Sequence, residues 1–333
     1  MGITVLPMES RLDCWDGSAG CPGVSSPISV TLPSVTTDAP ASPPLPPLAA
    51  RWAAICADIK LAHTVFALPF ALLAAHLAFL REGGYSWRLF WLVLAAMVTA
   101  RTAAMAFNRW LDRDIDARNP RTQSRAIPAG QARPVDMALF TAIACALFVL
   151  VAWRINPLAF ALSPVALAIV LGYSYAKRFT SLAHLWLGFS LAIAPMGAWI
   201  AVTGAFAPEP FWLVLAVLTW VGGFDVLYSC QDVRFDASEG LHSIPQTVGI
   251  PRALAISAAL HVLTVLALVG FGWSMALGAI YYGTVAIIAA ILLWEHRIVT
   301  PTDLSRINVA FFTLNGLVSV LLYAGVLLDT WLL

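Results

Sequence analysis

The chain has 333 residues, of which 60% are hydrophobic and only 11% charged. Its mean hydropathy of +0.82 lies outside the range of soluble globular domains. The formal net charge of +1 offers no electrostatic basis for binding nucleic acid, so no nucleic-acid partner is expected. The composition favours an integral membrane protein, with the lipid bilayer as its surroundings.

Residues 1–50 differ in composition from the rest of the chain. The stretch VTLPSVTTDAPASPPLPPLAA, residues 30–50, is rich in Pro, Ser and Thr and has little to bury. Such a composition is typical of disorder. We therefore predict a disordered extension over 1–50, followed by a transmembrane domain over 51–333.

From residue 61 onward the apolar residues come in long runs, each about as long as the roughly 17–25 residues that cross a bilayer. The runs are continuous rather than alternating, which argues against a β-barrel. The sequence thus predicts an all-α polytopic membrane protein with nine transmembrane helices. The predicted spans are 61–80, 88–112, 135–153, 157–175, 183–203, 211–231, 253–272, 275–294 and 307–328.

Basic residues are unevenly divided between the two sets of connections. The segment before the first span and the connections after the second, fourth, sixth and eighth spans carry most of the Lys and Arg. The positive-inside rule then places these connections in the cytoplasm. An anionic ligand would favour the same distribution, so the bias is not independent evidence of function.

The first acidic cluster ends the second span, in NRWLDRDIDARNPRTQSRAIPAG, residues 108–130. Asn108, Asp112 and Asp116 are spaced at i, i+4 and i+8. On a helix each such step advances about 40°, so the three side chains share one face. Asp114 points to another side.

The second acidic cluster ends the sixth span, in DVLYSCQDVRFD, residues 225–236. Asp225, Tyr228, Asp232 and Asp236 share one face if the helix continues. Both clusters lie at predicted cytoplasmic helix ends, so the two carboxylate faces can oppose each other. Solvated charges at helix ends are the plainer interpretation of one cluster, but two clusters of like spacing need a compensating cation.

Oxygen ligands in this number suit Mg²⁺, which commonly reaches phosphates through shared coordination. Arg121 and Arg125 beside the first cluster suit the remaining phosphate oxygens, and Arg118 is a weaker candidate. Carboxylates alone would repel a diphosphate, whereas both groups together indicate a metal-bridged diphosphate.

Both clusters resemble the two signatures of the UbiA intramembrane aromatic prenyltransferase superfamily. Asn108-x3-Asp112-x3-Asp116 precedes RTQSRAIPAG, and Asp225-x2-Tyr228-x3-Asp232-x3-Asp236 precedes GLHSIPQTVG. The resemblance extends through IKLAHTVFALPF, YSYAKRFTSLAH and APMGAWIAVTGA and covers about residues 55–330. It is greatest to the branch of 4-hydroxybenzoate polyprenyltransferases. Gln231 and Arg234 stand among the acids of the second cluster, which therefore has fewer carboxylates than in some members.

The resemblance implies nine helices around a central cavity, with Mg²⁺ and a polyprenyl diphosphate bound at the clusters. It implies four catalytic aspartates and a larger set of substrate-binding side chains. The implied catalytic residues are Asp112, Asp116, Asp232 and Asp236, which would hold the metal together with Asn108. The implied substrate-binding residues are Asn108, Arg101, Arg121, Arg125, Lys177, Arg178, Asp225 and Tyr228.

Arg101 lies about two turns deeper in the membrane than Asn108, where a guanidinium is costly unless it meets an anion. The carboxylate of an aromatic acceptor is one such anion, and an acidic residue of the sixth span, such as Asp225, is another. Tyr228, Tyr173 and Tyr175 could stabilise a prenyl cation through their ring faces. They could equally serve as packing or interfacial residues.

The sequence thus indicates Mg²⁺-dependent transfer of a polyprenyl group to the ring of an aromatic acid in ubiquinone or menaquinone biosynthesis. The expected acceptor is 4-hydroxybenzoate, and the alternative is a dihydroxynaphthoate. The expected location is the bacterial cytoplasmic (inner) membrane, with the active site on the cytoplasmic side. A secondary transporter of an anionic metabolite is the alternative of another class, although transporters place ions near the midplane. The acidic motif of CDP-alcohol phosphotransferases does not fit, because its glycines are missing.

Overall fold

Helices make up almost all of the regular structure in the described residues, 46–59 and 67–332 of a computed structural model, and these residues contain no strand. The all-α prediction is confirmed. The helices are α1 (Leu48–Asp58), α2 (Leu68–Arg81), α3 (Trp87–Leu111), α4 (Arg113–Arg118), α5 (Pro134–Ile155), α6 (Pro157–Ala176), α7 (Ala183–Thr203), α8 (Pro210–Ser229), α9 (Val233–Ser238), α10 (Ile244–Val248), α11 (Ile250–Ser274), α12 (Ala279–Ile298), the π-helix η2 (Val309–Leu314) and α13 (Asn315–Leu332).

Eight helical segments in the described residues are long and apolar enough to cross a bilayer. They are α3, α5, α6, α7, α8, α11, α12 and the continuous segment Val309–Leu332. The predicted first span, 61–80, coincides in part with α2, a shorter apolar helix of 14 residues. Its beginning lies outside the described residues, so the count of nine stays a prediction. The predicted extension over 1–50 also lies outside them up to residue 45, and α1 begins at Leu48.

Local sequence signals explain where several of these helices begin and end. The Asn156 side chain accepts a hydrogen bond from the Ala159 amide at 2.8 Å, capping α6 ahead of Pro157 at its first turn. Gly204 ends α7 with a φ of 71°, a left-handed conformation that favours glycine.

The predicted span 275–294 begins four residues too early, because the structure begins α12 at Ala279. Ala276 has a φ of 54° and breaks the helical path after α11. The Gly278 amide then donates to the Asp329 carboxylate at 2.6 Å, which fixes the turn before α12. A carboxylate near the end of the last helix is not visible as a turn signal in the local sequence.

Helix α8 packs mainly against α7 and α11. The approach to α7 depends on Gly188, where a Cβ atom would lie 2.4 Å from the Leu218 carbonyl oxygen. Small residues of this kind let membrane helices pack closely. The centre of the bundle is apolar and includes the buried Trp199, Trp220 and Phe271.

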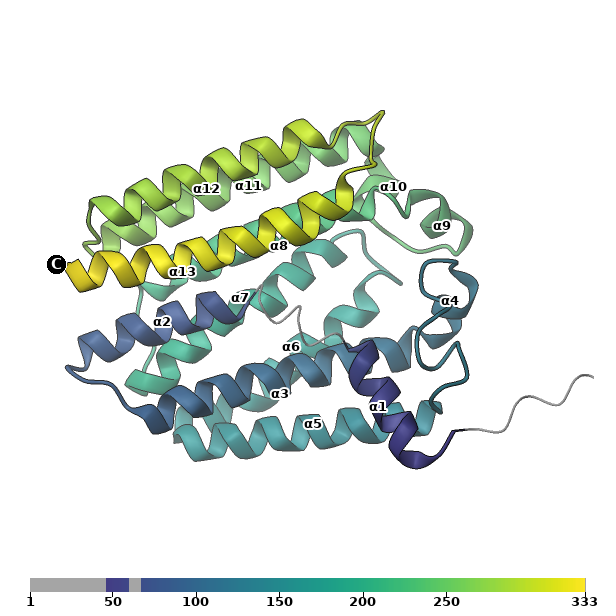
Figure 1. The fold of residues 1–333 in the computed structure, drawn as a ribbon, viewed down its shortest axis with the longest axis horizontal. Helices are drawn as coiled ribbons and strands as arrows, with labels where there is room; N and C mark the ends of the chain where they lie inside the picture. The colour runs from purple at the N-terminus through teal and green to yellow at the C-terminus, as the bar shows by residue number, and fades with distance from the viewer. Residues whose placement is uncertain (1–45, 60–66, 333) are drawn as a thin grey trace, which may run out of the picture. The chain divides into compact units, whose positions relative to one another are not determined.

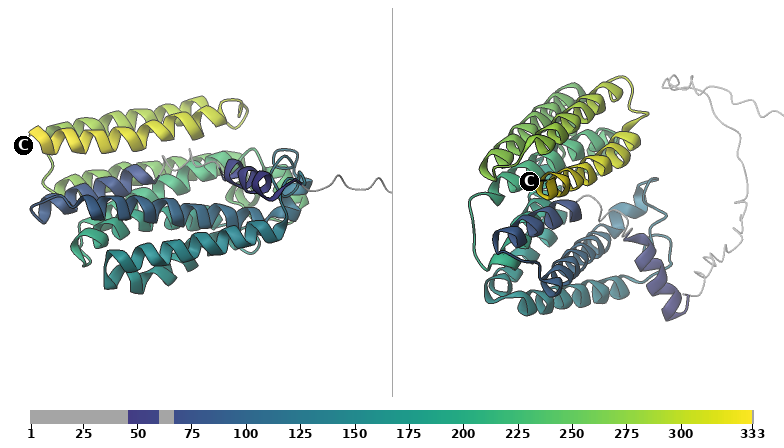
Figure 2. Two further views of the ribbon diagram at one scale, coloured as in Figure 1. Left: turned by 60° about the horizontal axis from the view of Figure 1, so that its bottom comes forward. Right: turned by 60° about the vertical axis from the view of Figure 1, so that its left-hand side comes forward.

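The short helices α4, α9 and α10 lie at one end of the long helices, as Figure 1 shows. The C-terminus lies at the opposite end (Figures 1 and 2). Both predicted acidic clusters therefore reach the same end of the bundle.

Candidate active site

Both acidic clusters line one polar cavity of about 240 Å³ at this end of the bundle. Its wall combines residues from the ends of α3, α6, α7 and α8 with the segments that follow α4 and α9. Ten of the predicted residues line it, namely Asn108, Asp112, Asp116, Arg121, Arg125, Tyr173, Lys177, Asp225, Asp232 and Asp236. Arg178 contacts Asp112 beside the cavity, whereas Arg101 and Tyr228 lie elsewhere.

Each cluster interrupts its helix at an aspartate, where the sequence predicted a continuous helical face. Asp112 lies between α3 and α4 with φ −89° and ψ 3°, and Asp232 precedes α9 with φ −98° and ψ 2°. Residues of active sites often adopt this bridge conformation. The Asp112 and Asp116 amides still donate to the carbonyls four residues earlier, at 2.9 and 2.8 Å, so the helical spacing of the first cluster is kept across the bend.

Asp112 is 1% exposed and is surrounded by hydrogen-bond donors. Lys177 Nζ and Asn108 Nδ2 donate to its Oδ2 at 2.5 and 3.0 Å, and Arg178 donates to its Oδ1 at 2.8 Å. Asp116, also buried, accepts from Arg125 at 2.5 Å. In the first cluster, Asp112 and Asp116 are therefore each paired with basic side chains. Asp114 instead lies on the surface, with a side chain that is 74% exposed.

The second cluster combines an ion pair, a buried histidine and a partly buried carboxyl group. Arg121 donates to Asp232 at 2.8 Å. His184 donates from Nδ1 to Asp225 at 2.7 Å, and its Nε2 accepts from the Ile244 amide at 3.3 Å. These two bonds define the neutral tautomer that carries its proton on Nδ1. Through His184 these bonds connect the beginning of α10 to α8.

Burial raises the pKa of the Asp236 carboxyl above its usual range, although a hydrogen bond from Ser243 acts in the opposite direction. The nearby charge of Asp232 adds to the rise.

Two ion pairs connect the segment that follows α3 with the segment that follows α8. Arg121 reaches Asp232, and Arg118 makes a bidentate contact with Glu239 at 2.6 to 3.0 Å. The hydrogen bonds from Arg118 lower the pKa of Glu239. Arg118, the weaker candidate for binding phosphate, is thus paired with Glu239 and does not line the polar cavity. The two acidic clusters face a shared space instead of pointing apart.

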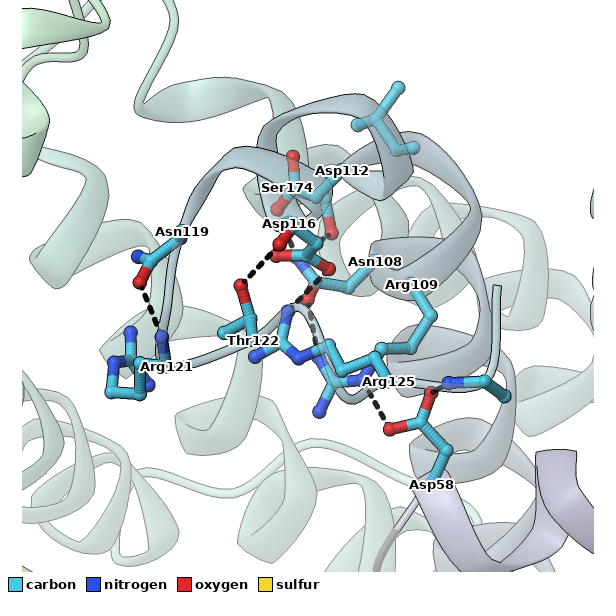
Figure 3. Close-up of polar contacts among 12 residues, drawn as sticks. Asp58, Asn108, Arg109, Asp112, Asp116, Asn119, Arg121, Thr122, Arg125 and Ser174 are labelled. Atoms are coloured by element: carbon cyan, nitrogen blue, oxygen red, sulfur yellow. Dashed lines mark hydrogen bonds and ion pairs between the residues drawn. The ribbon is translucent and has the colours of Figure 1, made fainter. Parts of the chain in front are cut away.

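A layer of polar residues that the sequence did not reveal supports the first cluster (Figure 3). Asp58, at the end of α1, accepts from Arg109 Nε at 3.3 Å and from the Ala126 amide at 3.1 Å. Arg109 also donates to the Asn108 side-chain oxygen at 3.1 Å. Asp58 therefore connects α1, the end of α3 and the arginine-bearing segment after α4.

That segment is held by further local contacts (Figure 3). The Asn119 side chain accepts from the Arg121 amide at 2.9 Å, and Thr122 Oγ1 donates to the Asp116 carbonyl at 3.0 Å. The only sequence signals were an Asn-Pro turn at 119–120 and an acidic residue at the end of an apolar stretch, WAAICAD.

A second, apolar cavity of about 220 Å³ lies deeper, between α3, α5, α6 and α7. Tyr173 and Leu187 line both cavities, so the polar and apolar cavities adjoin. Arg101 lies in the wall of the apolar cavity, and its buried Nε has no hydrogen-bond partner among the described residues. Asp225, the internal partner considered for Arg101, is paired with His184 instead.

Tyr228 lies outside the walls of both cavities. Its ring packs against Phe311 at a centroid distance of 4.1 Å, and the Arg121 guanidinium lies 5.8 Å from its centre. In this position Tyr228 contacts an arginine of the site, and its role in substrate binding stays a prediction. Tyr175 packs against Phe107 and is also absent from the cavity walls.

The donor set of the polar cavity suits a hard cation. No three His, Cys, Asp or Glu side chains converge as a ready metal site within residues 46–59 and 67–332. The cavity nevertheless presents carboxylate and amide oxygens from two sides, without sulfur ligands, and this chemistry fits Mg²⁺.

Apolar spanning helices that enclose such a cavity are typical of membrane enzymes that act on a lipid with an anionic head. The model of the UbiA prenyltransferase family matches residues 67–317. The chain therefore belongs to the UbiA prenyltransferase family, and it is a prenyltransferase embedded in the membrane.

Relatives and solved structures agree with this assignment. The 4-hydroxybenzoate octaprenyltransferase of Sodalis glossinidius is 32% identical over 69% of this chain and 78% of its own length. The enzyme of the same name from Vibrio parahaemolyticus is 29% identical over 75% and 87%. A UbiA homologue from Aeropyrum pernix has a TM-score of 0.74 and 35% identity, covering 81% of this chain and 99% of its own. A homologue from Archaeoglobus fulgidus bound to GPP and Mg²⁺ shares the fold, with a TM-score of 0.65, 20% identity, and coverage of 84% and 99%.

Proposed function

We propose that this enzyme transfers a polyprenyl group from polyprenyl diphosphate to the ring of 4-hydroxybenzoate, in quinone biosynthesis at the cytoplasmic side of the bacterial inner membrane. The observation that carries the proposal is the junction of the two cavities at Tyr173 and Leu187. The polar cavity suits a diphosphate, and the apolar cavity beside it suits a hydrocarbon chain. The names of the bacterial relatives support 4-hydroxybenzoate as the acceptor.

The residues proposed to hold Mg²⁺ are Asn108, Asp112, Asp116, Asp232 and Asp236. When bound, the metal supplies positive charge that stabilises the diphosphate leaving group. Lys177, Arg178, Arg121 and Arg125 are paired with these carboxylates and can exchange them for phosphate oxygens. The site therefore contains both the ligands for a cation and the donors for an anion.

In the proposed reaction the allylic C–O bond of the donor breaks, and diphosphate leaves with the bonding electrons. A ring carbon next to the phenol hydroxyl attacks the prenyl carbon, because the hydroxyl activates that position and the carboxylate occupies the opposite end of the ring. The ring then loses one proton. The products are the prenylated acid, diphosphate and a proton. Apolar walls exclude water, which would otherwise capture the prenyl cation.

Arg101 is the proposed partner of the acceptor carboxylate. Its guanidinium lies in a wall of small apolar residues, and its Nε has no partner among the described residues. A buried guanidinium of this kind is stabilised by an anion. With the carboxylate at Arg101, the acceptor ring would lie in the apolar cavity, which adjoins the polar cavity at Tyr173 and Leu187.

The proposal is tested with purified protein in detergent, polyprenyl diphosphates of several chain lengths, and either 4-hydroxybenzoate or a dihydroxynaphthoate. We expect Mg²⁺-dependent release of diphosphate together with prenylated 4-hydroxybenzoate, and no product after chelation by EDTA. Product only from the naphthoate would overturn the proposed acceptor. Transport of an anion without diphosphate release would instead identify a transporter.

Asp112→Ala and Asp232→Ala should each stay folded and lose at least about 100-fold in turnover, because each removes a ligand of the cation that stabilises the leaving group. Asp114→Ala is the matched control, since it removes an aspartate of the same sequence segment whose side chain is on the surface. Near-normal turnover of Asp112→Ala or Asp232→Ala would contradict the metal assignment.

A further inference from the structure

A separate polar cluster lies within the other half of the bundle, where α8, α12 and the beginning of α13 meet. Trp220, Glu295 and Asn315 are each 0% exposed. Asn315 donates to Glu295 Oε1 at 3.1 Å and accepts from Trp220 Nε1 at 2.7 Å. Polar groups inside a membrane domain are costly unless they are satisfied, and they commonly have a function. No residue of this cluster lines either cavity.

The same asparagine stabilises an unusual helical turn. Its amide also donates to the Ala310 carbonyl at 3.0 Å, inside the π-helix η2. Both amide hydrogens and the side-chain oxygen of Asn315 are therefore used. Single π-turns are rare and frequently occur at functional sites. At this wide turn the Ala310 carbonyl accepts a hydrogen bond from the Asn315 side chain, which joins the beginning of α13 to η2.

The π-helix presents two consecutive aromatic rings to α8. Phe311 packs on Tyr228 at 4.1 Å and on Phe224 at 5.1 Å, and Phe312 lies 6.1 Å from Tyr228. Tyr228 also contacts the Arg121 guanidinium, which is paired with Asp232. A continuous series of contacts thus connects the buried cluster with the polar cavity.

We propose that Asn315, held by Glu295 and Trp220, is a positioning residue for the diphosphate-binding part of the site. It fixes η2 so that Phe311 supports Tyr228 and Tyr228 supports Arg121 beside Asp232. The inference rests on the proposed function, because it takes Arg121 as a ligand of the diphosphate.

Asn315→Leu should raise KM for the polyprenyl diphosphate about tenfold, equivalent to about 1.4 kcal/mol, and weaken binding of inorganic diphosphate with Mg²⁺ by a similar factor. We expect kcat at saturating donor and KM for the acceptor to stay within about twofold of the unmodified enzyme. A rise in KM for the donor with unchanged kcat and unchanged KM for the acceptor would not follow from a general loss of stability, because that loss only lowers the amount of active enzyme.

Thr264→Val is the matched control. It removes a buried hydrogen bond of 2.9 Å between Thr264 and Thr219, which also joins two helices of this half but does not involve η2. We expect it to lower the melting temperature without changing diphosphate affinity. Equal losses of diphosphate affinity in Thr264→Val and Asn315→Leu would overturn the proposal.

A double variant, Glu295→Gln with Asn315→Asp, separates the helix junction from the π-turn. The glutamine can donate to the new carboxylate and Trp220 can still donate to it, but the Ala310 carbonyl loses its side-chain donor. We expect stability near that of the unmodified protein, with diphosphate affinity still reduced. Unchanged affinity in this variant would show that the Ala310 bond does not position the site.

Two further results separate the failure of this inference from the failure of the proposed function. A protein that binds diphosphate with Mg²⁺ but transfers no prenyl group would refute the proposed function. The diphosphate affinities of the Asn315 variants would still decide the role of Asn315. Absence of diphosphate binding would refute both. Adding Asn315→Leu to Tyr228→Leu should cause no further loss of affinity if Asn315 acts through Tyr228, and additive losses would contradict that route.

Discussion

Asp58 is the residue whose role is hardest to anticipate from the sequence. It lies 50 residues before Asn108, yet its carboxylate holds both Arg109 and the Ala126 amide. The side chains of Asp58 and Arg109 are each only 9% exposed. Outer polar partners of this kind orient the ligands of a metal and contribute to its affinity.

Asp58→Asn should therefore lower both the stability and the Mg²⁺ affinity of the enzyme. Removing the charge leaves Arg109 buried without its ionic partner, which costs about 3 kcal/mol, and Asn108 loses its fixed orientation. We expect the Mg²⁺ concentration for half-maximal activity to rise about tenfold.

The control for Asp58 is Glu209→Gln, which breaks the exposed Arg81–Glu209 pair at the beginning of α8, the end of this helix opposite the site. Its effect on stability should stay below about 1 kcal/mol. Thermal unfolding in detergent and Mg²⁺ titrations of activity measure both quantities. Equal, small effects of the two substitutions would show that Asp58 has no supporting role.

At the scale of helices and their connections, the sequence predicts the spanning helices well because each is a long apolar run. Breaks within them are less visible. The interruptions at Asp112 and Asp232 and the π-helix η2 depend on contacts with distant residues, as Asn315 and Glu295 illustrate. That the two clusters share one space could be predicted because both were expected at helix ends on the same side of the membrane. The supporting contacts of Asp58 and His184 could not be predicted, because their partners are distant in the sequence.

The Arg118–Glu239 pair joins the segments that carry the two clusters. Glu239→Gln should raise KM for the donor by less than about threefold, because exposed ion pairs contribute little. The effect should be smaller in about 0.5 M NaCl, where exposed charges are screened. Exchanging both charges, as Arg118→Glu with Glu239→Arg, should restore the KM of the unmodified enzyme.

The pH dependence of this contact follows from the direction of the pKa shift. The hydrogen bonds from Arg118 lower the pKa of Glu239 in the folded protein. The contribution of the pair is then fully present above the ordinary pKa of a glutamate and is lost as pH falls through the lowered value. The difference between Glu239→Gln and the unmodified enzyme should therefore be constant near neutral pH and vanish only in acid. A difference that disappears near pH 7 would contradict this assignment.

For the whole molecule, the site and the C-terminus lie at opposite ends of the helices (Figure 1). If the loops with the aspartates are cytoplasmic, the C-terminus lies on the other side of the membrane. Alkaline phosphatase fused to the C-terminus should then be active, and green fluorescent protein fused there should not fluoresce. A fluorescent C-terminal fusion would place the site on the other side of the membrane. A reporter fused after Ser238, which follows Asp236 in the same segment, should give the opposite result.

The ion pairs of Asp112, Asp116 and Asp232 with Lys177, Arg178, Arg125 and Arg121 have one more consequence. These charges compensate one another within the polypeptide, so chain insertion and helix assembly do not have to wait for magnesium or for a lipid. A newly made protein can reach its native arrangement in the bilayer first and acquire its ionic ligands afterwards from the aqueous side. If the enzyme uses Mg²⁺ as proposed, starvation for magnesium would silence it without removing it from the membrane.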